Sequence, residues 1–143
     1  TVWTSPLRRA ADTCALAGYG DHAEVIEDLV EWDYGELEGR TNAEIVAEQP
    51  GWQVWTHGAP GGETVAAVQR RVDRLVGRLL SLDDRVLIFG HGHLLRALAA
   101  RWIELPVTEG RRLLLDTAAS GELGWYHGRR ALAHWNLGPP VIP

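Results

Sequence analysis

The sequence VLIFGHGH at residues 86–93 decides the predicted fold. The near-continuous apolar run over residues 85–89 is typical of a strand that is buried on both faces. Residues 93–103 follow with the apolar spacing of an amphipathic helix. In open α/β sheets, ligands bind at the carboxyl ends of the strands, and a helix N-terminus there offers free N–H groups to an anion. The stretch therefore predicts a phosphate-binding junction that contains the titratable residue His91.

This junction has alternative interpretations. A GHG turn alone is weak evidence, because an ordinary turn also contains histidine at times. His91 and His93 are also a candidate metal pair. Side chains at i and i+2 of a helix start diverge, however, and no third ligand has a suitable spacing. We therefore expect no metal and no other cofactor.

Strands and helices alternate on both sides of the junction. The predicted strands are residues 1–5, 24–29 and 85–89, and residues 121–137 form an antiparallel hairpin that turns near Gly128. Four helices are predicted. Pro6 opens the first, which Gly18 and Gly20 end, and a Thr41–Glu44 capping box starts a short second one that stops before Pro50. The other two cover residues 63–80 and 93–103. Residues 31–39 and 51–62 are predicted to be irregular. This order predicts an α/β fold with a mostly parallel sheet and helices on both faces.

The clearest predicted helix, residues 63–80, has two faces. Its apolar face comprises Val65, Val68, Val72, Leu75, Val76 and Leu79. The arginines Arg70, Arg71, Arg74 and Arg78 are expected mostly on the opposite, solvated face.

Composition narrows the class of protein. The 143 residues correspond to one domain, and the hydrophobic fraction of 45% is enough for a core. A net charge of −5 argues against nucleic-acid and anionic-membrane partners. No apolar stretch is long enough to span a bilayer, and no signal peptide is visible. Cys14 is the only cysteine, which excludes an internal disulfide, fits a cytoplasmic setting and indicates a small core residue.

Two further segments carry candidate catalytic groups. TSPLRRAADT at residues 4–13 runs from a strand end into a helix, where Arg8 and Arg9 face different directions. One of them is placed to meet a bound phosphate, although solvation of both is the alternative. EWDYGELEG at residues 31–39 is a loop with four carboxylates. Cleavage of a phosphate ester needs an acid for the leaving oxygen, whereas the alternative is an acidic solvated loop.

In this order, these segments resemble the histidine phosphatase superfamily, which contains phosphoglycerate mutases and many acid phosphatases. TSPLRRAADT is similar to the family segment S-x-L-x-R-A-x-x-T, and EWDYGELEG resembles E-x-x-x-G-x-x-E-G. PGGET at residues 60–64 resembles P-x-G-E-S/T. FGHGHLLRAL matches S-H-G-x-x-x-R-x-L, with Gly90 in place of the usual serine. The resemblance covers essentially the whole chain and implies a phosphoglycerate mutase-like fold.

The resemblance also implies a role for each matching residue. Arg9 holds the phosphoryl group, and His91 hydrogen-bonds that group and stabilises it during transfer. Glu31 protonates the leaving oxygen and later activates water. Gly92 and the helix behind it contribute backbone N–H groups to phosphate binding.

The chain departs from the family pattern in one respect. The family's first motif, R-H-G, carries the histidine that attacks phosphorus and becomes phosphohistidine, and no such motif occurs in the 143 residues. His57-Gly58 comes closest, but Thr56 precedes it. We therefore expect an incomplete domain that lacks an N-terminal strand–helix unit, about thirty residues or more. Without that unit, apolar faces and strand edges are expected to be uncovered.

The implied activity is that of a phosphomonoester hydrolase of the acid phosphatase type. A cofactor-dependent phosphoglycerate mutase is the alternative enzyme. Such mutases carry a long insert with paired arginines between the acidic loop and the PGGE segment. In this chain only residues 40–59 fill that gap, and they contain no Arg or Lys beyond Arg40. Such mutases also tend to have arginine where this chain has Trp32, so both differences favour a phosphatase. A non-catalytic phosphate-binding module is the third alternative, if the native chain is this short.

The sequence says less about substrate and assembly. Trp32, Trp52 and Trp55 are candidates to line an apolar leaving-group pocket, and Trp32 in particular to contact substrate; buried packing is the alternative for each. The expected partner is a small phosphorylated metabolite. An exposed edge near the C-terminal hairpin is available for a homodimer, although nothing in the sequence requires one.

Overall fold

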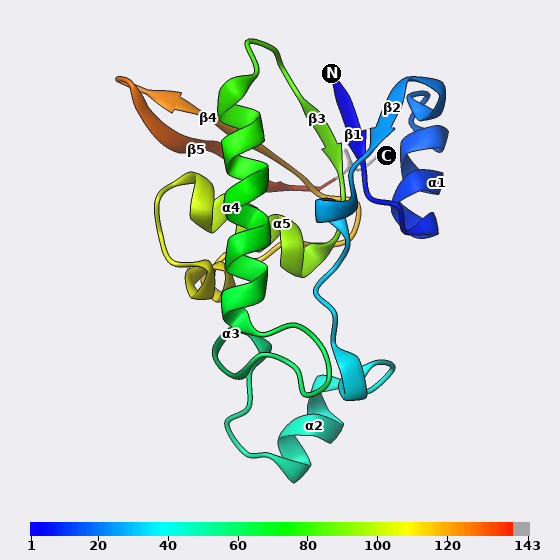
Figure 1. The fold of residues 1–143 in the computed structure, drawn as a ribbon, viewed down its shortest axis with the longest axis vertical. Helices are drawn as coiled ribbons and strands as arrows, with labels where there is room; N and C mark the ends of the chain where they lie inside the picture. The colour runs from blue at the N-terminus through cyan, green and yellow to red at the C-terminus, as the bar shows by residue number, and fades with distance from the viewer. Residues whose placement is uncertain (139–143) are drawn as a thin grey trace.

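The computed structural model describes residues 1–138, which form two separate β-sheets with helices around them (Figure 1). The strands are β1 (Val2–Thr4), β2 (Ala23–Val25), β3 (Leu87–Phe89), β4 (Ser120–Tyr126) and β5 (Arg129–Leu137). The α-helices are α1 (Arg8–Leu16), α2 (Asn42–Glu48), α3 (Val54–His57), α4 (Val65–Ser81) and α5 (Gly92–Trp102). Short 3-10 helices cover Gly20–His22, Glu27–Leu29, Gly35–Leu37 and Val107–Arg112. The predicted α/β class is confirmed.

The three-stranded sheet is parallel, and β1 lies at its centre in the order β2-β1-β3. Figure 1 shows α1 on one side of this sheet and α4 on the other. Thr4 is the register partner of Phe89, and the Ser5 N–H donates to the Phe89 carbonyl at 3.0 Å. The carboxyl ends of β1 and β3 therefore lie side by side, which brings the segments that follow them to the same edge.

Strand β3 is less buried than its sequence predicts. Leu87 is 41% exposed, and Ile88 and Phe89 are only half-buried, so the expectation of burial on both faces is wrong. Within residues 1–138, β3 pairs with β1 alone, and its other edge has no strand beside it. An edge strand lacks the neighbours that would cover its side chains.

Three local expectations need correction. Helix α1 begins at Arg8 with Leu7 as its N-cap, so Pro6 precedes the helix instead of opening it. Only Ala23–Val25 of the second predicted strand region is extended, because the chain then turns through Glu27–Leu29 and buries Leu29 completely against α4. The segment expected to be irregular contains the single turn of α3.

The predicted helix start and helix faces are otherwise confirmed. In the capping box of α2, the Thr41 N–H donates to Glu44 Oε2 at 2.7 Å and the Glu44 N–H donates to Thr41 Oγ1 at 3.3 Å. The apolar face of α4 lies at the centre of the core, which includes Val68, Val72, Leu75, Val76, Trp3, Leu94 and Leu98. Cys14 is buried as expected. Arg71 is not solvated: it is only 6% exposed, on the core side of α4.

The C-terminal hairpin is confirmed, with its turn at His127 and Gly128. Both residues have positive φ, +48° and +76°, as a tight turn between antiparallel strands requires. The Trp102 indole N–H donates to the Gly124 carbonyl at 3.1 Å, which attaches α5 to the hairpin. No helix of the described residues is long and apolar enough to cross a membrane.

Candidate active site

The site begins where β1 and β3 end. The Arg9 Nε–H donates to His91 Nδ1 at 3.1 Å, and His91 Nε2 lies 2.8 Å from Ser5 Oγ. Because an arginine Nε only donates, Nδ1 of the imidazole accepts and the proton resides on Nε2, facing Ser5. Ser5 is completely buried, and its Oγ also accepts the Leu7 N–H at 3.2 Å. Both ring nitrogens of His91 are therefore held by protein groups.

The electrostatic environment keeps the His91 imidazole uncharged. Burial, and then the positive charge of Arg9, lower the pKa of His91, and the charge of Glu31 only partly opposes them. The side chain is 6% exposed. A neutral imidazole with a fixed tautomer is a directed hydrogen-bonding group, not a cation.

The Glu31 carboxylate lies at the N-terminus of α5, for which His91 is the N-cap. Glu31 Oε1 accepts the N–H groups of Trp32 and Leu94, each at 2.9 Å, and Oε2 accepts the His93 N–H at 3.1 Å. The His93 and Leu94 N–H groups belong to the first turn of α5 and have no partner within the helix, and the helix dipole favours a negative charge there. The anion position that the sequence predicts at this junction is thus filled by the chain's own carboxylate.

The structure brings Arg9, His91 and Glu31 to one edge of the sheet. Arg9 and Glu31 both line a cavity of about 330 Å³, called the smaller cavity below, whose wall comprises Leu7, Arg9, Val30, Glu31, Trp32, Asp33, Tyr34 and Glu38. A Cβ atom added to Gly92 would meet no atom within 4 Å, so open space borders the backbone here. Arg8 points away and pairs with Asp12 while remaining 93% exposed, so only one of the two adjacent arginines faces the site.

Trp32 is a core residue. Its side chain is 1% exposed, and its indole N–H donates to the Glu63 carbonyl at 3.1 Å. The ring also packs edge-to-face on Trp55, with centroids 5.5 Å apart. The ring therefore packs in the core, as the packing alternative expects, while Trp32 also borders the smaller cavity; contact with a substrate stays a prediction.

A buried ion pair beneath the acidic loop was missed by the sequence reasoning. Arg71 donates to both Glu63 oxygens, from Nε at 2.9 Å and from Nη2 at 2.6 Å. Its Nη1 donates to the carbonyls of Asp28 and Val30 at 2.8 and 2.7 Å. The guanidinium therefore fixes the backbone just before Glu31.

A signal for this pair exists in the sequence. Arg71 follows Val68 by three positions and precedes Leu75 by four, so it falls at the margin of the apolar face of α4. A lone charge in such a position needs a buried partner. Glu63, eight residues earlier in the PGGET segment, supplies it.

A second missed pair is Tyr34 with His93. The Tyr34 hydroxyl lies 2.6 Å from His93 Nδ1, and the His93 ring packs against Trp55 with centroids 5.2 Å apart. Burial, followed by the charges of Glu31 and Glu38, raises the pKa of Tyr34, whereas burial lowers the pKa of His93. Both groups therefore stay uncharged at about pH 7, since each shift favours the neutral form.

Residues 1–138 offer no candidate metal centre: no group of three or more His, Cys, Asp or Glu side chains among them is placed to hold an ion. The polar groups of the site converge instead on a helix N-terminus, an arginine and a neutral imidazole. This set of groups is chemically suited to an oxyanion.

Known proteins resemble this chain along almost its whole length. The profile of the histidine phosphatase superfamily (branch 1) matches residues 1–138. The chain is 47% identical over 134 residues to an acid phosphatase of Mycobacterium tuberculosis, covering 92% of this chain and 66% of that protein. It is 32% identical over 132 residues to a sedoheptulose 1,7-bisphosphatase of Saccharomyces cerevisiae, covering 74% of this chain and 48% of that protein.

Solved structures of similar proteins superpose on this chain. An open reading frame product of Mycobacterium tuberculosis superposes with a TM-score of 0.91 at 45% identity, covering 96% of this chain and 72% of that one. A mycobacterial glucosyl-3-phosphoglycerate phosphatase in complex with inorganic phosphate gives a TM-score of 0.79 at 30% identity, covering 96% and 76%.

The fold and the site together define an α/β protein in which an arginine, an imidazole and a helix N-terminus meet at the edge of a parallel sheet. The chain belongs to the histidine phosphatase superfamily. It spans 66% of the acid phosphatase and about half of the yeast bisphosphatase that it matches.

Proposed function

We propose that this chain supplies most of the active site of a phosphomonoester hydrolase that works through a phosphohistidine intermediate. The proposal rests on the Arg9–His91 hydrogen bond beside the Glu31-capped N-terminus of α5, where Arg9 and Glu31 line the smaller cavity. In this proposal the nucleophilic histidine lies on a segment of the native protein outside these 143 residues. A small phosphorylated metabolite is the substrate.

Two displacement steps follow from these roles. In the first, the nucleophilic imidazole nitrogen bonds to phosphorus, the ester P–O bond breaks, and the Glu31 carboxyl gives its proton to the leaving oxygen. In the second, a water oxygen bonds to phosphorus while Glu31 takes the water proton and the P–N bond breaks, which releases inorganic phosphate. Arg9 binds the equatorial phosphoryl oxygens through its remaining guanidinium N–H groups, and the Nε2–H of His91 exchanges its hydrogen bond to Ser5 for one to a phosphoryl oxygen.

Glu31 and the phosphoryl group share one binding surface in this scheme. The N–H groups of His93 and Leu94 that Glu31 occupies are the same groups that a phosphoryl oxygen would use. Arrival of the phosphoryl group therefore displaces the carboxyl group from the helix N-terminus toward the ester oxygen. The names of the relatives, an acid phosphatase and two sugar-type phosphatases, support hydrolysis of phosphate esters.

The test uses the full-length protein. Hydrolysis of p-nitrophenyl phosphate should proceed undiminished in the presence of a chelator, and acid-labile phosphohistidine should appear in protein quenched during turnover. Transfer of the phosphoryl group between phosphoglycerates, with little release of inorganic phosphate, would favour a mutase. Absence of both reactions, with phosphate still bound, would reduce the protein to a binding module.

A further inference from the structure

Glu63 directs all of its polar groups to the acidic loop, residues 31–39, or to the arginine beneath it. The Glu63 N–H donates to the Asp33 carbonyl at 2.9 Å, and the Glu63 carbonyl accepts the Trp32 indole N–H at 3.1 Å. Glu63 Oε2 accepts the Asp33 N–H at 3.1 Å. Both carboxylate oxygens also accept from Arg71, at 2.9 and 2.6 Å. The two residues that follow Glu31 are therefore attached to one residue of the PGGET segment.

The PGGET segment approaches the acidic loop so closely that only glycines fit between the two. The Glu36 N–H donates to the Pro60 carbonyl at 2.9 Å. A Cβ atom added to Gly62 would clash with the Asp33 carbonyl oxygen, and one added to Gly35 would clash with the Gly62 nitrogen. A side chain at either position would therefore push the two backbones apart. The close fit leaves the start of the loop one backbone position relative to the PGGET segment.

Arg71 holds the residues on the other side of the same backbone. Its Nη1 donates to the Asp28 and Val30 carbonyls, and its Nη2 lies 3.4 Å from the Glu31 carbonyl oxygen. The two-pronged pair with the Glu63 carboxylate orients this guanidinium, which is only 6% exposed. The Glu31 backbone is thus fixed on both sides by one ion pair, and rotation of the Glu31 side chain is the movement left to its carboxyl group.

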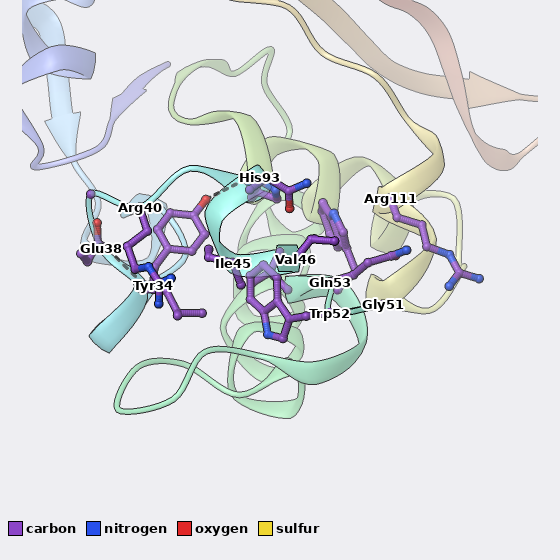
Figure 2. A pocket seen from close by; sticks show the side chains of 15 residues that line it. Tyr34, Glu38, Arg40, Ile45, Val46, Gly51, Trp52, Gln53, His93 and Arg111 are labelled. Atoms are coloured by element: carbon purple, nitrogen blue, oxygen red, sulfur yellow. Dashed lines mark hydrogen bonds between the residues drawn. The ribbon is translucent and has the colours of Figure 1, made fainter. Parts of the chain in front are cut away.

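The rest of the loop is attached elsewhere, so Glu63 is not its only support. Figure 2 shows Tyr34 and His93 in the wall of a neighbouring cavity of about 710 Å³, with the Tyr34 hydroxyl 2.6 Å from His93 Nδ1. The Tyr34 N–H donates to Glu38 Oε1 at 3.1 Å. Neither of these contacts involves Glu31. Loss of the Glu63 carboxylate is therefore expected to loosen the start of the loop and to leave the remainder in place.

We propose that Glu63 is a positioning residue for the acid Glu31, and that it fixes the backbone position from which the Glu31 carboxyl reaches the leaving oxygen. This inference rests on the proposed phosphatase function. Glu63 does not line the smaller cavity, so its effect on the reaction passes through Glu31. Because the backbone is held, side-chain rotation alone carries the carboxyl group from the N-terminus of α5 to the ester oxygen. A shift of the backbone by about 1 Å would misplace the acid and cost up to about 100-fold in rate.

The test compares a poor and a good leaving group in the full-length protein. Glu63→Gln keeps the size of the side chain, but it removes the charge that pairs with Arg71 and leaves one acceptor oxygen in place of two. It should lower kcat for an alkyl ester such as glycerol 3-phosphate by about 10- to 30-fold, and for p-nitrophenyl phosphate by less than about 3-fold, because only the first needs the acid. Glu24→Gln, at an exposed pair with Arg78, is the matched control and should change neither rate.

A positioning role also predicts that two substitutions are not additive. In a Glu31→Gln background, Glu63→Gln should lower the rate for the alkyl ester by less than about 2-fold further, since the group that it positions is gone. Equal losses for both esters in both backgrounds would indicate a purely structural role and overturn the inference. Arg71→Lys keeps a cation beside Glu63 without the planar fork, and it should give the same selective loss at about 3- to 10-fold. This variant decides the matter if Glu63→Gln does not fold.

An NMR measurement separates this inference from the proposed function. The His93 and Leu94 N–H groups bond to the Glu31 carboxylate, so their amide signals should shift when acidification protonates Glu31, and Glu63→Gln should reduce that shift. If it does so but the wild-type protein hydrolyses no ester, Glu63 positions Glu31 and the phosphatase proposal fails. If Glu31→Gln selectively slows the alkyl ester while Glu63→Gln changes neither rates nor amide signals, the phosphatase proposal stands and the role of Glu63 fails.

Discussion

The His91 side of the site and the larger neighbouring cavity of about 710 Å³, which His93 lines, differ in how their polar groups are satisfied. At the first, His91 uses both ring nitrogens within the chain, and the Glu31 carboxylate accepts three backbone N–H groups. At the second, His93 uses one ring nitrogen, and the Trp52 indole N–H has no acceptor among the described residues. Side chains that are already held by hydrogen bonds are ordered before a ligand arrives, which lowers the cost of binding it. In the proposed function, the groups on the His91 side are therefore ordered before a substrate arrives.

This contrast predicts that substitution of His91 causes the greatest loss of activity. His91→Ala removes an imidazole that Ser5 and Arg9 hold in place, and kcat for p-nitrophenyl phosphate in the full-length protein should fall by about 1,000-fold. Circular dichroism should remain that of the folded protein. His22→Ala, an exposed histidine outside the site, is the control. Turnover within a few-fold of wild type would remove His91 from the mechanism.

The buried ion pair of Arg71 and Glu63, which holds the backbone before the acidic loop, should contribute to the stability of the fold. Arg71→Ala leaves Glu63 and the carbonyls of Asp28 and Val30 without their donor, and the free energy of unfolding should fall by about 3 kcal/mol. Arg74→Ala on the same helix breaks a mostly exposed pair with Asp28 and should cost less than about 1 kcal/mol. Urea denaturation measures both. Equal costs would show that the buried pair does not hold the loop.

The acid role of Glu31 predicts an effect that depends on the leaving group. Glu31→Gln should lower kcat for a poor leaving group such as an alkyl alcohol by about 100-fold, and for p-nitrophenol by less than about 10-fold, because a good leaving group needs little proton assistance. The exposed Glu27→Gln substitution should change neither rate. The same fractional loss for both substrates would argue against Glu31 as the acid.

The buried His91 and the half-buried His93 predict a smaller effect, a dependence of stability on pH. Because burial lowers the pKa of His91 and of His93, the unfolded chain binds more protons than the folded one as the pH falls from about 7.5 to about 5.5. The free energy of unfolding should therefore decrease over this interval. His93→Phe should reduce that decrease, as measured from urea midpoints at the two pH values. An identical decrease in both proteins would contradict the depressed pKa of His93.

The sequence predicted the elements whose cause is local. The capping box of α2, the apolar face of α4 and the turn at Gly128 each depend on residues close together in the chain, and all three are present. The meeting of Arg9 and His91 was also expected, since parallel strands end at a common edge of the sheet.

The features that the sequence did not predict depend on tertiary contacts between residues far apart in the chain. Helical spacing gives the position of Arg71 around α4 but not the loop that covers it, so its burial against Glu63 was not foreseen. For Trp32 the sequence left substrate contact and buried packing open, and tertiary packing places its ring in the core. Likewise, nothing near Tyr34 in the sequence indicates that its hydroxyl reaches His93, which is fifty-nine positions away.

Much of the wall of the larger cavity comes from one short span of chain, residues 39–55. Arg9, Glu31 and His91 all lie outside that span, and the ion pair that supports the acidic loop is formed by Glu63 and Arg71, which also lie outside it. Under the proposed function, substitutions within residues 39–55 would alter this cavity without replacing any side chain assigned to the phosphoryl group.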